Sequence, residues 1–119
     1  MYSKIFTTST LLVSFFFFGS SAFAIDFVEA APNQTKVLME NDKVRVIKVT
    51  NKKGDKIPMH SHPDLVVYVV KGGKIRFTNA DGKVIEAESK TGDATFRPAV
   101  THAHEHLTDG EAIVVELKK

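Results

Sequence analysis

The five histidines of this 119-residue chain lie in two short clusters, forty residues apart. His60 and His62 stand in the sequence MHSHPD, and His102, His104 and His106 stand in THAHEH. Residues two apart in a strand point to the same face, so each cluster can present its imidazoles together. Neutral imidazole is a good ligand for divalent first-row metals. Two histidines from one strand and a third from another would leave coordination positions open, which is typical of a catalytic metal.

Other side chains near the clusters could take part in chemistry. Tyr68 could face the interior and hydrogen-bond a ligand. Arg76 and Arg97 could bind a carboxylate substrate through their forked donors. Phe77 and Phe96 could form the wall of a pocket.

Two carboxylates lie close to the histidines in sequence. Asp64 is two residues from His62, so it is the better candidate for a spare ligand or for a partner of a ligand histidine. Strand parity points Glu105 away from His102. A structural explanation stays open for all these residues, since a His-x-His segment also occurs on polar surfaces and Tyr68 could be plain core.

The elements that would position these residues are short apolar or alternating runs separated by glycine and aspartate turns. The expected strands are 43–49, 65–70, 74–78, 83–88, 94–97 and 112–117. Asp81-Gly82 is a strong hairpin signal. The alternation in 43–49 changes face midway, which indicates a bulge or a strand buried on both faces. Strands that recur about every 8–12 residues, without a helical stretch, predict an all-β sandwich or barrel.

The first 24 residues have the features of a secretory signal peptide. Lys4 is followed by an apolar stretch at 11–18 and an Ala-x-Ala sequence at 22–24, so we expect cleavage before Ile25. An uncleaved anchor is the alternative, but serines and threonines interrupt the apolar residues that a span needs. The expected product is periplasmic or secreted, with no membrane attachment.

The remaining chain is expected to hold an N-terminal arm at 25–35 and one domain at 36–119. Removing residues 1–24 removes one lysine and no acid, which leaves 15 − 14 = +1 and gives no reason to expect a nucleic-acid partner. The chain has no cysteine, so disulfides and a thiol nucleophile are excluded. The core is modest in size, and oligomerisation would help it.

The motifs around both histidine clusters resemble those of the cupin family. The first reads as a glycine, five residues, His-x-His and a closing glycine, and the second reads as a glycine, five residues, a proline and a histidine. The matching positions are Gly54, His60, His62, Gly72 or Gly73, Gly92, Pro98 and His102. The match spans about 36–117 and is nearest to small single-domain cupins of type 2, some of which are linked by name to β-alanine degradation.

The resemblance implies a double-stranded β-helix, a jelly-roll barrel with a metal inside it near one mouth. His60, His62 and His102 match the metal-binding histidines of the family. The family's glutamate ligand would fall at Leu65 or Val66, where no side chain can bind metal. The resemblance also implies a homodimer that forms through the N-terminal strands.

Three departures concern the second motif. His106 replaces the asparagine of the family motif, the glycine after Pro98 is missing, and the loop before His102 is one residue shorter. His104 or His106 could help to bind the metal or carry a proton beside it, or both could line the barrel and hydrogen-bond to neighbours.

Three functions remain open from the sequence. The first is a metal-dependent enzyme, dioxygenase-like, that uses iron, manganese, nickel or zinc on a small organic substrate. The second is a module that binds a metal or a small ligand without turnover. The third is a dimerising scaffold in which the histidines have no chemical role.

Overall fold

Short strands joined by turns build residues 24–119, the part of the chain that the computed structural model describes. The strands are β1 (Ile25–Asp26), β2 (Thr35–Glu40), β3 (Val44–Asn51), β4 (Lys56–His62), β5 (Leu65–Lys71), β6 (Gly73–Asn79), β7 (Val84–Ser89), β8 (Ala94–Arg97), β9 (Val100–His106) and β10 (Gly110–Leu117). One four-residue helix, α1 (Phe27–Ala30), interrupts them. The predicted strands are therefore confirmed, with boundaries that differ by a few residues.

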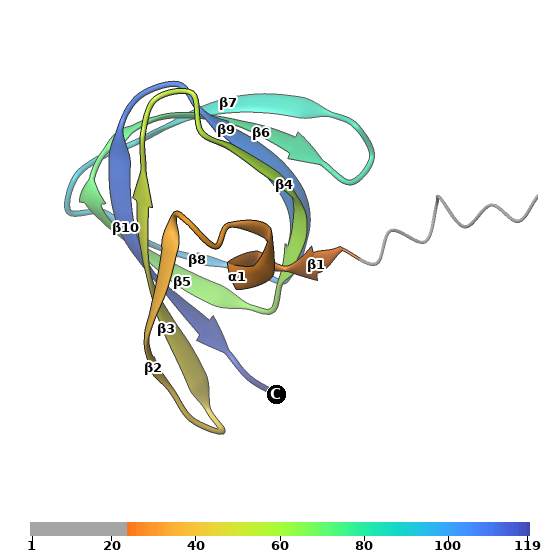
Figure 1. Ribbon diagram of the computed structural model, residues 1–119, viewed down its shortest axis with the longest axis vertical. Helices are drawn as coiled ribbons and strands as arrows, with labels where there is room; N and C mark the ends of the chain where they lie inside the picture. The colour runs from red at the N-terminus through yellow and green to blue at the C-terminus, as the bar shows by residue number, and fades with distance from the viewer. Residues whose placement is uncertain (1–23) are drawn as a thin grey trace, which may run out of the picture.

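Two five-stranded sheets face each other around a common interior (Figure 1). The strand order is β1-β4-β9-β6-β7 in the first sheet and β2-β3-β10-β5-β8 in the second. Every pair is antiparallel except β1 with β4. Apart from the β2-β3 and β6-β7 hairpins, neighbouring strands are not consecutive in sequence, and the first sheet brings β4 and β9, which carry the two histidine clusters, side by side. The predicted all-β barrel is confirmed.

Strand β3 is continuous where the sequence left open a bulge. It pairs with β10 without interruption, from Asn51 opposite Gly110 to Val44 opposite Leu117. The irregularity lies in the neighbouring strand β2, between Val37 and Met39. The change of apolar face in 43–49 therefore reflects a strand with apolar side chains on both faces.

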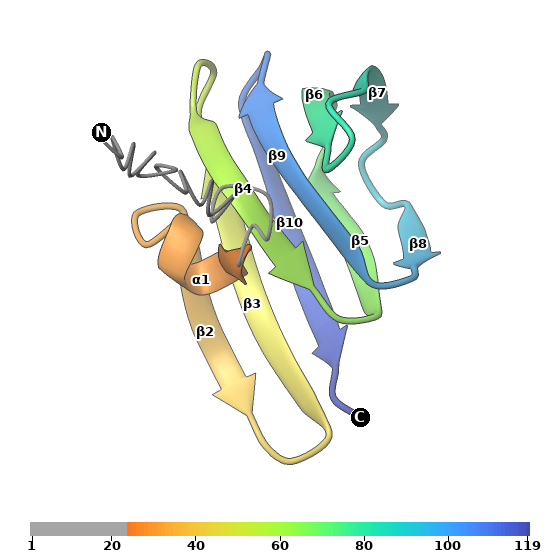
Figure 2. The ribbon, with the colours of Figure 1, turned by 90° about the vertical axis from the view of Figure 1, so that its right-hand side faces the viewer.

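The N-terminal segment contributes to the barrel core. Phe27 and Ala31 are buried, and they cluster with the core residues Ile47, Val49, Ile57, Leu65 and Val114. The expected arm at 25–35 thus packs into the domain, and Figure 2 shows α1 lying against the strands at one side of the barrel. Asp26 caps the helix by accepting a hydrogen bond from the Val28 backbone N–H (3.0 Å). A single helical turn is too short to produce a sequence period, which is why no helix was predicted.

The Asp81-Gly82 hairpin is confirmed between β6 and β7. Gly82 has φ of 87°, a value that favours glycine, and its N–H donates to the Asn79 carbonyl (2.9 Å). The hairpin joins β6 to the edge strand β7, and β6 pairs on its other side with β9.

The expected signal peptide lies, except for Ala24, outside the described residues and stays a prediction. Within residues 24–119, no helix has the length and apolar character needed to cross a membrane.

We expect Phe27→Ala to lower the free energy of unfolding by about 3 kcal/mol, because it removes a buried ring that the core cannot fully collapse around. Phe27 is only 2% exposed. Urea unfolding followed by circular dichroism measures the change. Val84→Ala is the control, since Val84 is 54% exposed, and it should shift stability by about 0.5 kcal/mol or less. Equal losses of unfolding free energy in the two variants would show that the packing of Phe27 does not stabilise the core.

Candidate metal centre

A bulge in β4 turns the first histidine pair toward the interior. Strand β4 is in register with β9 at Ile57 opposite His104 and again at His60 opposite His102, with one extra residue of β4 between these points. The bulge falls at Pro58, which has no N–H to give to the ladder. Since the extra residue changes the alternation, Ile57 and His60 both face the core, with exposures of 2% and 0%.

Three histidines converge inside the barrel. His60 and His62 come from β4 and His102 comes from the adjacent β9, and all three are buried. Each offers a ring nitrogen, and these nitrogens lie within 4.8 Å of one another. The ring centroids are separated by 4.8, 4.9 and 5.4 Å. The structure therefore brings together the three residues that the sequence singled out, in an arrangement that can bind a metal ion.

Hydrogen bonds fix the tautomers of the first two rings. Nδ1 of His60 lies 2.8 Å from the Pro58 carbonyl oxygen, and Nδ1 of His62 lies 2.8 Å from a carboxylate oxygen of Glu116. Both oxygens can only accept, so each Nδ1 carries the hydrogen and donates it. Each Nε2 therefore keeps a lone pair for an external partner.

These two lone pairs point at one another across a short gap. The Nε2 atoms of His60 and His62 are 3.0 Å apart, where two acceptors repel unless a cation or a proton lies between them. Burial lowers the pKa of His60 to about 4, so the His60 ring does not supply a proton to this gap at neutral pH. Two nitrogens bound at about 2.1 Å and at right angles on one ion would be about 3.0 Å apart. The pair thus fits a divalent metal.

Glu116 is the functional residue that the sequence did not reveal. It lies on β10, is 2% exposed, and its Oε2 accepts the hydrogen bond from His62. Its Oε1 accepts from the Arg45 guanidinium, at 2.8 Å from Nε. A carboxylate in this position orients the imidazole and increases its basicity toward a metal.

Asp64, which we expected to be the partner of a ligand histidine, has another role. Its Oδ1 accepts from the Ala99 backbone N–H (2.8 Å), so it ties together the loops that follow β4 and β8. The expectation was wrong because the chain turns after His62 and carries Asp64 away. Glu105 points away from His102, as predicted, and pairs with Arg76 on the outside (3.2 Å).

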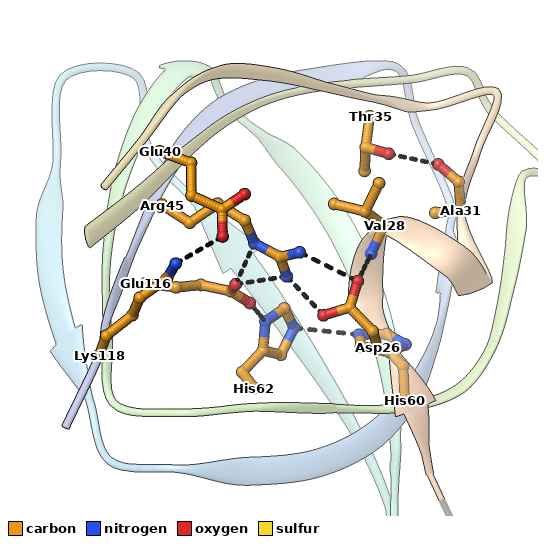
Figure 3. Close-up of polar contacts among 10 residues, drawn as sticks. All are labelled: Asp26, Val28, Ala31, Thr35, Glu40, Arg45, His60, His62, Glu116 and Lys118. Carbon is orange, nitrogen blue, oxygen red and sulfur yellow. Dashed lines mark hydrogen bonds and ion pairs between the residues drawn. The ribbon is translucent and has the colours of Figure 1, made fainter. Parts of the chain in front are cut away.

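A chain of charges links this site to the N-terminal segment, as Figure 3 shows. Arg45 bridges Glu116 and Asp26, with contacts of 2.6 and 2.5 Å from Nη2. The pKa of Asp26 is lowered, since the Arg45 hydrogen bond and charge outweigh the opposing effect of burial. The same two carboxylates raise the pKa of Arg45 against the effect of burial. The orientation of His62 therefore depends on residues from β1, β3 and β10.

The two remaining histidines share the inner face of β9 with His102, as predicted. His104 lies with its ring centroid 5.3 Å from that of His60, and His106 lies one step farther, 5.0 Å from His104. Nδ1 of His104 and Nε2 of His106 are buried without a partner among the described residues. Burial lowers the pKa of both, to about 2 for His104. These neutral rings present unsatisfied nitrogens beside the triad.

Strand parity separates the other candidates into inner and outer residues. The expectation that Tyr68 faces the barrel interior is wrong, since its side chain is 47% exposed. The inner positions of β5 are taken by Leu65, Val67 and Val69, which line the cavity. Phe96, 60% exposed, is also outside and cannot form a pocket wall.

A cavity of about 210 Å³ lies inside the barrel beside the triad. Phe77 and Arg97 line it, together with all three histidines of β9. Arg76 lies outside it and pairs with Glu86 (2.7 Å). The cavity can hold a small molecule next to a metal on His62 and His102.

The comparisons with known proteins agree with this architecture. A cupin domain from Bordetella pertussis Tohama I is 22% identical, with a TM-score of 0.65 over 71% of this chain and 92% of that one. An RmlC-like cupin from Desulfovibrio desulfuricans is 24% identical, with a TM-score of 0.54 over 70% and 79%. An RmlC-like cupin with a double-stranded β-helix from Methanocaldococcus jannaschii is 16% identical, with a TM-score of 0.58 over 71% and 78%.

No protein-family model and no curated protein sequence matches the chain. The structural similarity establishes the fold: this chain has the double-stranded β-helix fold of the cupins. Inside it lie three buried histidines that can bind a metal.

Acid should destabilise the metal-free protein. Burial lowers the pKa values of His60, His102 and His104 to about 4, 3 and 2, well below the value of 6.5 in an unfolded chain. The unfolded state therefore binds more protons below pH 6.5, and stability should fall from there to about pH 4. In this pH range each of the three residues lowers the free energy of unfolding by about 1.4 kcal/mol for each pH unit of acidification.

Urea unfolding in a chelator at several pH values measures this slope. His104→Leu removes one titrating group, so its slope between pH 6 and 5 should be smaller by about 1.4 kcal/mol per pH unit. Stability that stays constant from pH 7 to pH 5 would contradict the assignment of neutral buried imidazoles.

Replacing the carboxylate that orients His62 should weaken metal binding. We expect Glu116→Gln to reduce affinity about 10–100-fold, because the neutral amide leaves the imidazole less basic. Competition with a chromogenic chelator measures the affinity, and circular dichroism checks the fold. Glu105→Gln is the matched control on the outer face and should bind metal normally. Unchanged affinity in Glu116→Gln would show that the contact has no role in metal binding.

Proposed function

We propose that this protein is an exported, metal-dependent cupin enzyme that acts on a small organic molecule held in the barrel cavity. The observation that carries the proposal is the pair of Nε2 atoms of His60 and His62, which lie 3.0 Å apart while the Nδ1 atom of each ring is engaged by Pro58 or Glu116. Together with His102 they make a donor set that suits divalent iron, manganese, nickel or zinc.

A metal held by three imidazoles supplies a Lewis acid, a template or a redox centre with open positions. The chain's own residues then have distinct tasks. Glu116 and Pro58 hold the tautomers of the ligand histidines. Phe27 covers the rings of His60 and His62 (centroids 4.8 and 4.6 Å) and excludes water on that side.

His104 is the residue best placed to move a proton. It lines the cavity with its ring centroid 5.3 Å from that of His60, and burial keeps its ring neutral. Its unpaired nitrogen can accept a hydrogen bond from a bound substrate. With a pKa lowered to about 2, the ring takes up a proton only in a complex in which a negative charge beside it raises that pKa. His106 stands one step farther from the triad on the same face, where it can hold the substrate or exchange protons with His104.

A binding module without turnover is the second candidate. The metal triad includes no carboxylate, and the expected family glutamate is absent. This module holds a metal or a small ligand in the barrel, and it differs from the enzyme in that no substrate is consumed.

The expected homodimer and export remain predictions. The homodimer is supported by the outer face of the second sheet, where the register aligns apolar side chains across all five strands. This row consists of Met39, Val46, Val115, Val66 and Phe96.

Metal analysis tests the site directly. The protein purified without chelator should contain about one metal per chain by plasma mass spectrometry, and His102→Ala should lose it, because two imidazoles bind a metal more weakly than three. His106→Ala is the matched control on the same strand and should keep the metal. Absence of metal from the unmodified protein after incubation with iron, manganese, nickel and zinc would contradict the proposal.

The identity of the metal then selects the assay for turnover. If the metal is iron or nickel, the assay is oxygen uptake. If it is zinc or manganese, the assay is hydrolysis or isomerisation. A metal-loaded protein that binds small molecules without consuming them would support the binding module.

A further inference from the structure

Arg97 is a cation inside the barrel without a counter-ion. The chain has three arginines, and two of them are committed to carboxylates: Arg45 to Asp26 and Glu116, and Arg76 to Glu86 and Glu105. Arg97 makes no ion pair and no side-chain hydrogen bond among residues 24–119, although it lines the cavity. Its guanidinium is held instead against the ring of Phe77, with Cζ 5.3 Å from the centroid.

Arg97 lies in the same layer of the barrel as the metal centre. Leu65 is directly opposite Arg97 on one side and directly opposite Glu116 on the other, so the three form one row across the second sheet. Glu116 contacts His62. The Phe77 ring, which contacts the Arg97 guanidinium, also lies beside His102, with 5.1 Å between the two ring centroids. A small molecule bound at the metal therefore lies within the reach of Arg97.

The acidic residues of the lining belong to the opposite end of the cavity. Glu88 is opposite Lys74 in register and Glu111 is opposite Lys71, at the ends of β6 and β5 away from the histidine triad. Asp93 lies at the same end, where its backbone carbonyl accepts from the Val69 N–H (2.9 Å). Asp109 is engaged by the Lys53 backbone N–H (2.8 Å). Between the two ends the wall carries the apolar side chains of Val67, Phe77 and Val114, with His104 opposite Phe77 in register.

We propose that the cavity binds a small organic acid, whose carboxylate pairs with Arg97 while another oxygen of the same molecule faces the three-histidine site. This inference deepens the proposed function and rests on it. A guanidinium that is half-buried and free of partners matches a carboxylate in charge and in bidentate geometry. Contact with Phe77 restricts the guanidinium without using its N–H donors. The apolar wall between the two ends suits the carbon skeleton of the acid.

Arginine side-chain resonances provide a direct test, because only three Nε–Hε signals exist in the protein. Metal-loaded, ¹⁵N-labelled protein is titrated with propionate and succinate, and separately with their uncharged isosteres propionamide and succinamide. The Arg97 signal, assigned by its loss in Arg97→Gln, should shift saturably with the acids and not with the amides. The Arg45 and Arg76 signals should stay in place.

Two variants separate recognition by Arg97 from direct binding of carboxylate to the metal. Arg97→Gln should weaken succinate binding about tenfold or more, since it removes a charge-assisted contact. Arg76→Gln removes the same charge from the outer surface and should leave binding unchanged. Equal affinity of Arg97→Gln and the unmodified protein, or equal shifts with succinamide, would overturn the proposal.

Failure of this inference is distinguishable from failure of the proposed function. Metal content is measured on every sample before titration. A protein that holds metal fully but shows no shift of the Arg97 signal refutes only the organic-acid ligand. A protein that holds no metal refutes the metal centre itself, whatever its response to succinate.

Discussion

A buried carboxylate is the constraint on which the rest of this barrel depends. Glu116 is 2% exposed, and an ionised carboxylate in such a place is strongly destabilising unless it is paired and hydrogen-bonded. It is satisfied by Arg45 from β3 and His62 from β4, two strands that belong to different sheets. The same contacts that make the charge tolerable also fix the tautomer of a metal ligand. Stability of the barrel and preorganisation of the metal centre are thus consequences of one interaction.

This dependence extends to the beginning of the domain. Asp26 completes the pairing of Arg45 and also caps α1, whose Phe27 packs on the rings of His60 and His62. Ile25 and Asp26 pair in parallel with His60 and Ser61 of β4. The short N-terminal segment therefore closes the barrel at the metal end and is part of the site. Its sequence position directly after the expected cleavage site means that the closing residues would become the new terminus of the exported protein.

The interior divides into layers with different chemistry. At one end, buried histidines and the paired Glu116 form a site suited to a cation. Arg97 lies at the same level and is suited to an anion, and apolar residues fill the wall beyond it. His104 and His106 continue along the inner face of β9 with unsatisfied nitrogens. A molecule with a carboxylate, an apolar skeleton and a metal-binding oxygen would satisfy all these groups together.

The sequence by itself determined the features that depend on local geometry. Alternation and turn residues predicted the strands, and the period of two correctly placed His102, His104 and His106 on one face. The tertiary structure decided what depends on long-range packing. Residues 112–117 are apolar on both faces, so parity alone could not show that Glu116 faces inward, and β5 presents the same ambiguity for Tyr68. Phe27 belongs to a helical turn too short to have a period, so only its packing reveals it as core. Which charges find partners was likewise settled in three dimensions, because Arg45, Arg76 and Arg97 look alike in sequence and only the fold brings carboxylates to two of them.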